Sequence, residues 1–271
     1  MKIKILVDNI SNISELNAEH GFSAFIEEEK NRILFDTGVS ENIIKNSELL
    51  RINLKQTDFL IISHNHYDHT GGVEVLKKIF DNKPNLIIGE KFFTTKYKKN
   101  NSEYQKISND FIIEKELSDF FKIIYVNDIL KLSDNIFIIR LSNGKSILKD
   151  YFFIKDTKEN FVEDNFNDEI ILVYKNNNEL SILSGCSHTG IEHIIKTVSS
   201  FFKTEKIKTI IGGLHLEKVT DNYFFKLTDM LKQKKIMLYP GHCTGGNRLN
   251  QLKEILKHNC ETLETGKKIN L

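Results

Sequence analysis

The sequence predicts an α/β fold of the αββα type, in which two β-sheets pack together and helices cover their outer faces. Strand-like segments come in two batches, and a helix-like segment follows each batch. Polar loops rich in histidine and glycine lie where predicted strands end. This order favours a sandwich over a single helical layer or an open sheet. No linker or repeat interrupts the chain, so residues 1–271 are predicted to form one domain.

The first half of the chain is predicted to consist mainly of strands. Residues 57–80 are interpreted as a buried strand, a polar loop and a helix. The polar stretch around 94–110 is interpreted as surface loop or helix, and residues 90–125 could form a lid or an insertion. Alternating or apolar patterns predict the other strands of this half, at residues 2–9, 21–28, 32–38, 85–90, 121–126 and 135–141.

The second half alternates strands and helices. Residues 169–185 are predicted to form a hairpin that turns at a run of three asparagines. Thr189 and Glu192 have the spacing of a capping box at the start of the next helix. The apolar face of that helix is predicted to comprise Ile191, Ile194, Ile195, Val198 and Phe202. Strands are then predicted at 207–216, 235–246 and 267–271, and helices at 220–233 and around Leu249, Leu252 and Leu256.

The composition limits the class of protein. The chain is 40% hydrophobic, which is enough for a core of its own. A net charge of +1 argues against a general binder of nucleic acids or membrane surfaces. The sequence contains no signal peptide and no run of ~20 apolar residues that would span a membrane. Three cysteines do not make a disulfide framework, so a cytoplasmic protein with reduced thiols is expected.

The segment SHNHYDHTGG, residues 63–72, predicts a metal site. His64 and His66 lie two residues apart just past a predicted strand, so in an extended segment both rings point to the same side and can bind one ion. Asp68 and His69 follow in the same loop and can bind a second ion. Imidazole together with carboxylate suits zinc, iron or manganese, whereas calcium and magnesium prefer oxygen ligands.

Three more histidines lie in comparable places, each after an apolar strand and beside glycines: His188, His215 and His242. Ligand sites in α/β proteins collect where strands end. Helices are expected after the first and the last of these residues, and their N-terminal N–H groups would favour an anionic substrate. His20 is interpreted as a turn residue that could also line the pocket.

The motif His-x-His-x-Asp-His at residues 64–69 resembles the signature of the metallo-β-lactamase superfamily. The segments ILFDTG and YPGHCTGG also resemble motifs of that family, and their order covers nearly the whole chain. The pattern is most similar to the branch typified by the dihydropterin-ribofuranosylaminobenzene-phosphate synthase. The resemblance implies a four-layer αββα fold, one or two metal ions, usually zinc, and a buried Asp36 that orients the histidine loop.

Two departures from the family pattern affect the ligand assignment. The family usually has a further histidine after the loop and then an aspartate that bridges both ions. Here no histidine lies between His69 and His188, so His188 is assigned as the third ligand of the first site. Cys186 stands where the bridging aspartate is expected. It could be a thiolate ligand or a small buried residue, and the second interpretation is favoured.

The remaining assignments follow from the resemblance to the family. His242 matches the terminal histidine motif and is assigned to the second site. His215 then contacts either the substrate or the metal ligands, without binding an ion itself, although the roles of these two histidines could be swapped. Asp68 is expected to bind the second ion and to help hold the attacking water.

The predicted function is metal-dependent hydrolysis, or a related transfer, on a small anionic substrate that is phosphate-bearing or pterin-like. One alternative is a phosphodiesterase or nuclease, because relatives with this loop cut nucleic acids; the near-neutral charge argues against long polymers. Another is a metal or thiol redox sensor without turnover, in which Cys186 and Cys243 are the working groups. Neither a membrane partner nor a nucleic-acid partner is expected.

Overall fold

The computed structural model describes residues 1–271 and contains three β-sheets. The first sheet has seven strands, in the order β17 (Lys268–Asn270), β1 (Lys2–Val7), β2 (Ser23–Glu28), β3 (Asn31–Phe35), β4 (Phe59–Ile61), β5 (Asn85–Gly89) and β8 (Lys122–Val126). The second has six, in the order β16 (Met237–Gly241), β15 (Lys206–Gly213), β14 (Glu179–Ser184), β13 (Ile170–Asn176), β10 (Ile136–Arg140) and β9 (Ile129–Lys131). The third has four, in the order β12 (Phe161–Glu163), β11 (Phe152–Lys155), β6 (Lys96–Asn100) and β7 (Glu103–Lys106).

The two large sheets pack face to face through one shared cluster of buried side chains. Ile5 of β1 and Ile138 of β10 both belong to this inner cluster. Their chain neighbours Leu6 and Ile139 belong instead to the two outer clusters. Successive side chains of a strand point to opposite faces, so each large sheet buries apolar residues on both sides.

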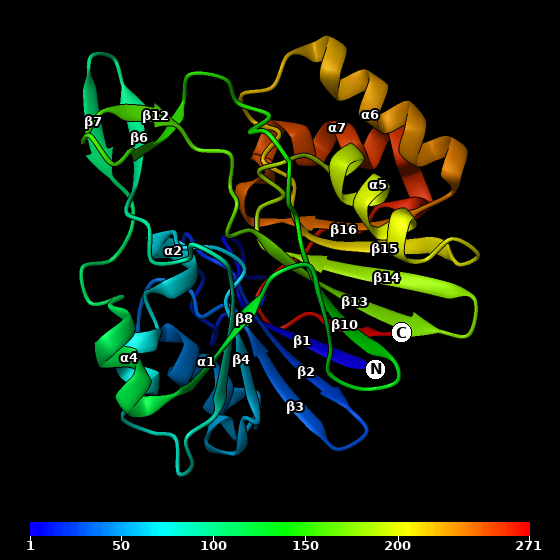
Figure 1. Cartoon of the computed structure of the whole chain (residues 1–271). Coiled ribbons are helices and arrows are strands. Elements are labelled where there is room, and N and C mark those ends of the chain that lie inside the picture. Colours follow the sequence, from blue (N-terminus) through cyan, green and yellow to red (C-terminus); the bar gives the residue numbers. More distant parts are fainter.

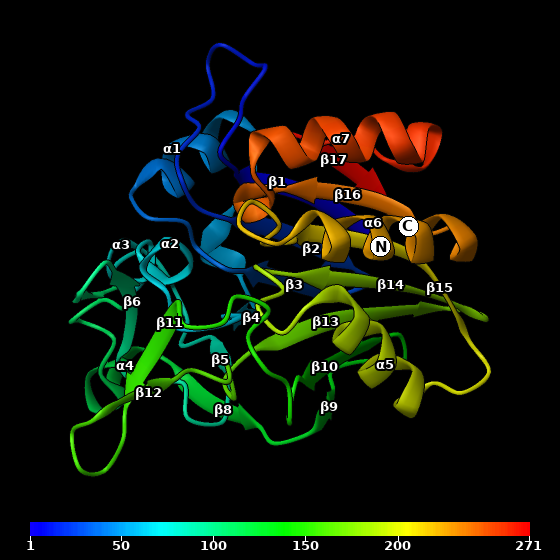
Figure 2. The ribbon, with the colours of Figure 1, turned by 90° about the horizontal axis from the view of Figure 1, so that it is seen from above.

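Helices cover both outer faces and complete the four layers. The helices α5 (Ile191–Phe201), α6 (Asp221–Lys234) and α7 (Gly246–Leu256) pack on the second sheet (Figure 1). The helices α1 (Asn42–Leu49), α3 (Val73–Leu76) and α4 (Glu114–Phe120) pack on the first sheet (Figure 2). The predicted αββα fold is therefore confirmed. None of the helices combines the length and the apolarity that crossing a bilayer requires.

The polar segment around 94–110 differs from its prediction, because it contains the hairpin β6–β7 rather than only loop or helix. This hairpin pairs with β11 to form the third sheet, which projects beside the two large ones (Figure 1). Tyr104 stacks on Phe161 of β12, with ring centroids 3.8 Å apart. Aromatic residues thus hold this small sheet together, whereas the lysines that surround them in the sequence conceal the strand pattern.

Of two local predictions about helices, one is confirmed and one is wrong. The helix expected at the end of 57–80 is α3, which is short, and the polar loop before it contains a further short helix, α2 (Tyr67–Thr70), separated from α3 by two glycines. The capping box of α5 is not formed, because Gly190 is the N-cap residue, with φ of 86°. The Thr189 hydroxyl instead donates to Oε2 of Glu169 at 2.8 Å. A buried carboxylate needs hydrogen-bond donors, and this need outweighs the capping preference.

Candidate metal centre

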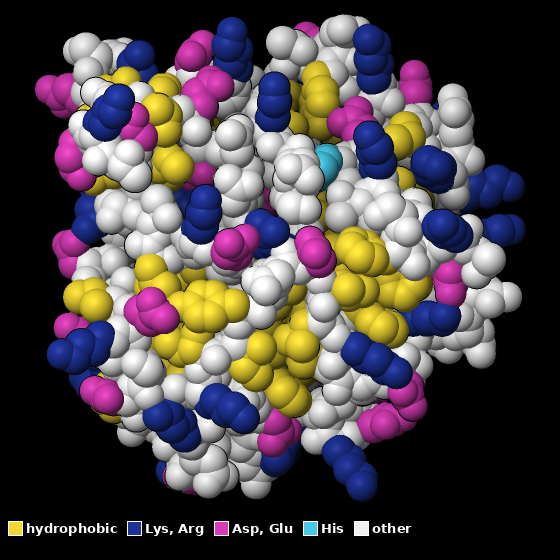
Figure 3. All heavy atoms as spheres, viewed as in Figure 1, with side chains coloured by type: hydrophobic (Ala, Val, Ile, Leu, Met, Phe, Trp, Pro, Cys, Tyr) yellow, Lys and Arg dark blue, Asp and Glu magenta, His cyan; other side chains and the backbone are white.

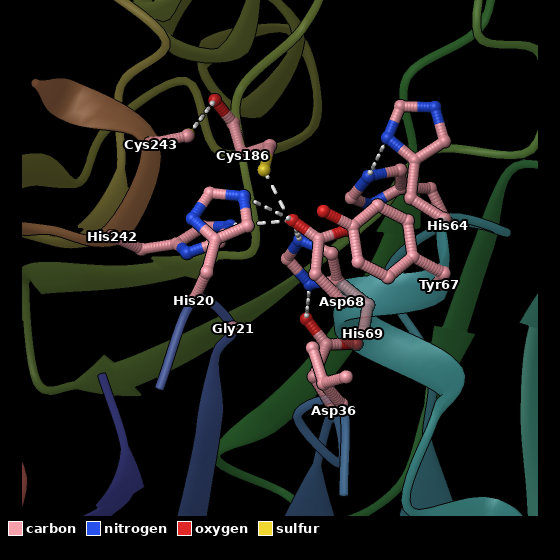
Figure 4. A network of polar contacts seen from close by, with 12 residues as sticks. His20, Gly21, Asp36, His64, Tyr67, Asp68, His69, Cys186, His242 and Cys243 are labelled. Carbon is pink, nitrogen blue, oxygen red and sulfur yellow. Dashed lines mark hydrogen bonds and ion pairs between the residues drawn. The ribbon is translucent and has the colours of Figure 1, made fainter. Parts of the chain in front are cut away.

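The histidine loop begins where the parallel strands β3 and β4 end, and a buried carboxylate fixes it there. Asp36, directly after β3, accepts the backbone N–H and the hydroxyl of Ser63, both at 2.7 Å. The same carboxylate lies 2.7 Å from Nδ1 of His69 at the other end of the loop (Figure 4). It therefore orients both ends of the loop and directs Nε2 of His69 into the site.

A first group of candidate ligands consists of His64, His66 and His188. Nε2 of His64 lies 3.0 Å from Nδ1 of His66 and 3.1 Å from Nε2 of His188. All three side chains are buried. Burial lowers the pKa of each ring well below its ordinary value, so the rings are neutral. Neutral imidazole is the form that binds a metal ion.

A second group consists of Asp68, His69 and His242. The Asp68 Oδ2 atom lies 3.3 Å from Nε2 of His242 and 4.0 Å from Nε2 of His69. Burial alone would raise the pKa of Asp68, but His69, His20 and His242 hold it well below its ordinary value. Burial alone would lower the pKa of His69, but Asp36 and Asp68 outweigh it and raise that pKa to about 9. Without an ion His69 is therefore protonated, and an ion that binds Nε2 would displace that proton. The group combines a carboxylate and imidazoles, a donor set that suits a divalent ion.

The hydrogen bonding of these histidines fits metal binding. Nε2 of His66, Nδ1 of His188 and Nε2 of His242 are buried and have no hydrogen-bond partner. Nδ1 of His242 lies 3.0 Å from the side-chain oxygen of Asn9, which assigns the proton to that nitrogen and leaves Nε2 with a lone pair. A buried polar atom without a partner is costly, and a cation bound beside Nε2 of His242 would satisfy that atom. In the first group the converging nitrogens are instead Nδ1 of His66 and Nε2 of His188.

Cys186 lies between the two groups. Its sulfur is 3.1 Å from Nε2 of His69 and within ligand reach of His64. The residue is buried, and Figure 4 shows its sulfur directed toward His69 and the carboxylate of Asp68. The structure thus places a thiol at the centre of the site, where the family pattern led us to expect an aspartate.

His215 and His20 lie beside these groups rather than within them. The ring centroid of His215 is 4.5 Å from that of His188, and His215 belongs to a further cluster with Cys186. His20, interpreted mainly as a turn residue, has its Nε2 atom 3.3 Å from Oδ2 of Asp68. Its side chain is 54% exposed, so it forms the outer edge of the site.

A cavity of about 170 Å³ opens onto both groups. Tyr151 and Phe152, at the start of β11, contribute aromatic rings to its wall. Lys98 of β6 and Lys218 contribute ammonium groups, and Nζ of Lys218 lies 3.1 Å from the Tyr151 hydroxyl. The third sheet therefore supplies part of the cavity wall but none of the candidate ligands.

A buried lysine fastens the third sheet to the histidine loop. Nζ of Lys96 on β6 lies 2.7 Å from Asp164 and 2.5 Å from Asp168. Asp168 also accepts the backbone N–H of Asn65, between the first two histidines, at 3.0 Å. Phe166, in the same segment as the two aspartates, stacks on His188 with ring centroids 4.0 Å apart. The segment 164–168 thus connects the small sheet to the first group.

The N-terminus of α5 was expected to favour a substrate anion, and Glu169 holds the loop that leads into this helix. Its carboxylate accepts the backbone N–H of His188 at 2.7 Å and that of Thr189 at 3.1 Å. Burial raises the pKa of Glu169 to about 7, although these hydrogen bonds oppose the shift. Glu169 therefore holds the backbone of a candidate ligand, and the anion contact expected at the N-terminus of α5 stays a prediction.

Comparison with known proteins identifies the family. Residues 16–140 match the model of the metallo-beta-lactamase superfamily. The 7,8-dihydropterin-6-methyl-4-(beta-D-ribofuranosyl)-aminobenzene-5'-phosphate synthase of Methanocaldococcus jannaschii is 30% identical in an alignment of 279 positions, which covers 92% of this chain and 89% of that protein. The chain therefore belongs to the metallo-β-lactamase superfamily, and its similarity to the synthase branch is confirmed.

Two further relatives cover almost the whole chain. An uncharacterized protein of Methanocaldococcus jannaschii is 33% identical over 260 residues, which cover 93% of this chain and 94% of that protein. A crystal structure described as a metal-dependent hydrolase of the beta-lactamase superfamily is 27% identical, with a TM-score of 0.83. That similarity covers 100% of this chain and 99% of the other. This protein thus has the fold of metal-dependent hydrolases and candidate metal sites built from histidine and aspartate.

Proposed function

We propose that this protein is a metal-dependent hydrolase, or catalyses a related transfer, and that it holds two divalent ions. His64, His66 and His188 would hold the first ion, and Asp68, His69 and His242 the second. The observation that carries the proposal is the convergence of two buried ligand groups, each with its donor atoms within 4.8 Å of one another. Nitrogen and oxygen donors of this kind suit zinc, and iron or manganese would also fit.

Bound ions in such a centre activate a water and polarise a phosphoryl or carbonyl oxygen. The protein itself positions the reacting groups. The ionised carboxylate of Asp68 faces the cavity and accepts a hydrogen bond from the attacking water, which fixes the direction of attack. His20, at the outer edge, is within reach of a substrate or water that contacts Asp68. Asp36 and Glu169 hold the loop and the backbone of His188 in place.

The cavity wall supports a small anionic substrate with a planar ring. Lys98 and Lys218 supply positive charge for a phosphate or carboxylate, and Tyr151 and Phe152 supply flat apolar surface. The name of the synthase relative contains both a dihydropterin and a phosphate, which agrees with this combination. A phosphate-bearing or pterin-like molecule is therefore the substrate class that we propose.

The outer surface of the protein fits a long nucleic acid less well than the cavity fits a small anion. Figure 3 shows lysine and arginine side chains interspersed with aspartate and glutamate over the face it presents. The net charge is +1, whereas binding along a phosphate backbone requires a stripe of positive charge. We also propose a cytoplasmic location, because thiols beside a metal centre stay reduced there; fractionation of cells would test this location.

The test uses His66→Ala and, as a matched control, His258→Ala, which changes an exposed histidine away from the cavity. Each protein is loaded with zinc, iron or manganese, and its content of bound metal is measured. Its hydrolytic activity is measured with para-nitrophenyl phosphate and with bis-para-nitrophenyl phosphate. We expect His66→Ala to lose one ion per chain and its hydrolytic activity, and the control to retain both. Full metal content and full turnover in His66→Ala would refute the proposal.

A further inference from the structure

A second kind of ligand cluster lies next to the two groups described above. Cys186, His215 and Cys243 have their donor atoms within 4.8 Å of one another. They follow the ends of β14, β15 and β16, which are neighbouring parallel strands of the second sheet. Parallel pairing brings the three strand ends to one edge, so residues far apart in the sequence meet there.

The packing leaves room for the two sulfur atoms to approach each other. The Cys243 sulfur lies 3.6 Å from the backbone oxygen of Cys186. A Cβ atom at Gly213 would lie 2.5 Å from that sulfur and 3.3 Å from the Cα atom of Cys186. Any side chain at position 213 would therefore displace Cys243 from the cluster.

One ring nitrogen of His215 has no hydrogen-bond partner. This atom is Nδ1, and it is buried. The ring packs between His188 and Phe152, with centroid distances of 4.5 Å and 5.3 Å, so its orientation is fixed. All three members of the cluster also line the cavity, which gives an ion a route of entry.

We propose that Cys186, His215 and Cys243 form a third metal site, which takes a zinc ion. Two sulfur atoms and one imidazole nitrogen make a three-residue set that zinc accepts with a fourth position open. Manganese, magnesium and calcium prefer oxygen ligands, so this site is expected to select zinc over these ions more strongly than the histidine and aspartate groups do. On binding, each cysteine releases its thiol proton to solvent, and no electrons are transferred.

The two thiolates would balance the charge of the third ion, so this ion would act beside the proposed hydrolytic centre as a Lewis acid and not through added net charge. Cys186 also lies within ligand reach of His64 and His69, so its thiolate connects the third site to the other two. The open position of the third ion would face the cavity, where it can bind a phosphate or carboxylate oxygen of the substrate. The site thus supplies a further contact for anions in the cavity.

The experiment counts zinc in the full-length protein and in three variants. Cys243→Ser removes one sulfur ligand with little change in size, and Cys260→Ser changes a buried thiol outside the cluster. His66→Ala removes a ligand of the first group only. Bound zinc is measured by inductively coupled plasma mass spectrometry. Thiolate ligation is measured by the near-ultraviolet charge-transfer absorption of the cobalt-loaded proteins.

We expect three zinc ions in the unmodified protein and in Cys260→Ser, and two in Cys243→Ser, which should also lose most of the charge-transfer absorption. His66→Ala should lose one ion yet keep that absorption, which separates this site from the hydrolytic centre. If Cys243→Ser is unfolded by circular dichroism, His215→Ala should show the same loss of one zinc. Unchanged zinc content and absorption in a folded variant, or a Cys186–Cys243 disulfide in protein isolated without oxygen, would overturn the proposal.

Discussion

Replacing Lys96 with methionine tests whether the buried ion pair that fastens the third sheet stabilises the protein. The side chains of Lys96, Asp164 and Asp168 are only 3%, 4% and 1% exposed. Methionine keeps the length of the lysine stem but removes its charge, so two carboxylates remain buried without a cation. Breaking a buried pair in this way costs about 3–5 kcal/mol, because the partner charge is left uncompensated. Since every ~1.4 kcal/mol is tenfold, the folding equilibrium should fall by at least about a hundredfold.

The free energy of unfolding is measured by urea denaturation of the metal-free proteins. Lys131→Met is the control, because the partner Asp134 is 93% exposed and such a surface pair contributes about 0–1 kcal/mol. A triple variant with Asp164→Asn and Asp168→Asn should recover part of the loss, since it removes the stranded charges. A loss below about 1 kcal/mol in Lys96→Met would refute the reasoning, because it would be no larger than that of a surface pair.

The remaining predictions concern ligand orientation, thiol ionisation and substrate binding. Asp36→Asn should weaken zinc binding by about 10–100-fold in a chelator competition, because His69 loses the carboxylate that orients it; an unchanged affinity would contradict this role. Burial raises the pKa of Cys260 from 9.0 to about 11, so its alkylation at pH 8 should be about a hundredfold slower in folded than in urea-unfolded protein. Because the pKa of the Cys260 thiol is higher in the folded than in the unfolded protein, the free energy of unfolding should fall as the pH rises from 9.0 towards about 11. Urea titrations at a series of pH values should show that this fall is absent in Cys260→Ser. Lys218→Met should raise the KM for para-nitrophenyl phosphate with little change in kcat, because the variant loses a positive charge that binds the substrate. Equal losses in kcat and kcat/KM would contradict this and would mean that Lys218 acts only in the transition state.

The fold was predictable because its layers follow from local patterns. The alternation of side chains in strands such as β1 and β10 shows which residues can face each sheet, and the helical spacing of α5 shows which face it buries. The third sheet was missed because Lys96, Lys98 and Lys99 make β6 look like a solvated loop. The structure shows that one of these lysines is buried, and only its distant partners explain why.

The candidate site was predictable where its residues form a short motif or match a motif of the family, as His188 and His242 do. His64, His66, Asp68 and His69 form one motif, whereas the cluster at Cys186 and Cys243 joins residues 57 positions apart. Their meeting depends on the register of β14, β15 and β16, which no short pattern in the chain reveals. His20 was similarly hidden, since a single histidine before a glycine has no distinguishing neighbours.

The third sheet contributes to the choice of substrate in this protein but not to the candidate metal sites. Its strands come from two segments, 96–106 and 152–163, and they shape the mouth of the cavity without supplying a candidate ligand. Exchanging these segments with those of a relative would therefore change which molecules enter while leaving the ligand groups intact. The exchange has two constraints. The incoming strand must carry a lysine that fits between Asp164 and Asp168. It must also keep the aromatic ring of Phe152, which packs against His188 and His215. This small sheet is thus a natural unit for redesigning substrate preference.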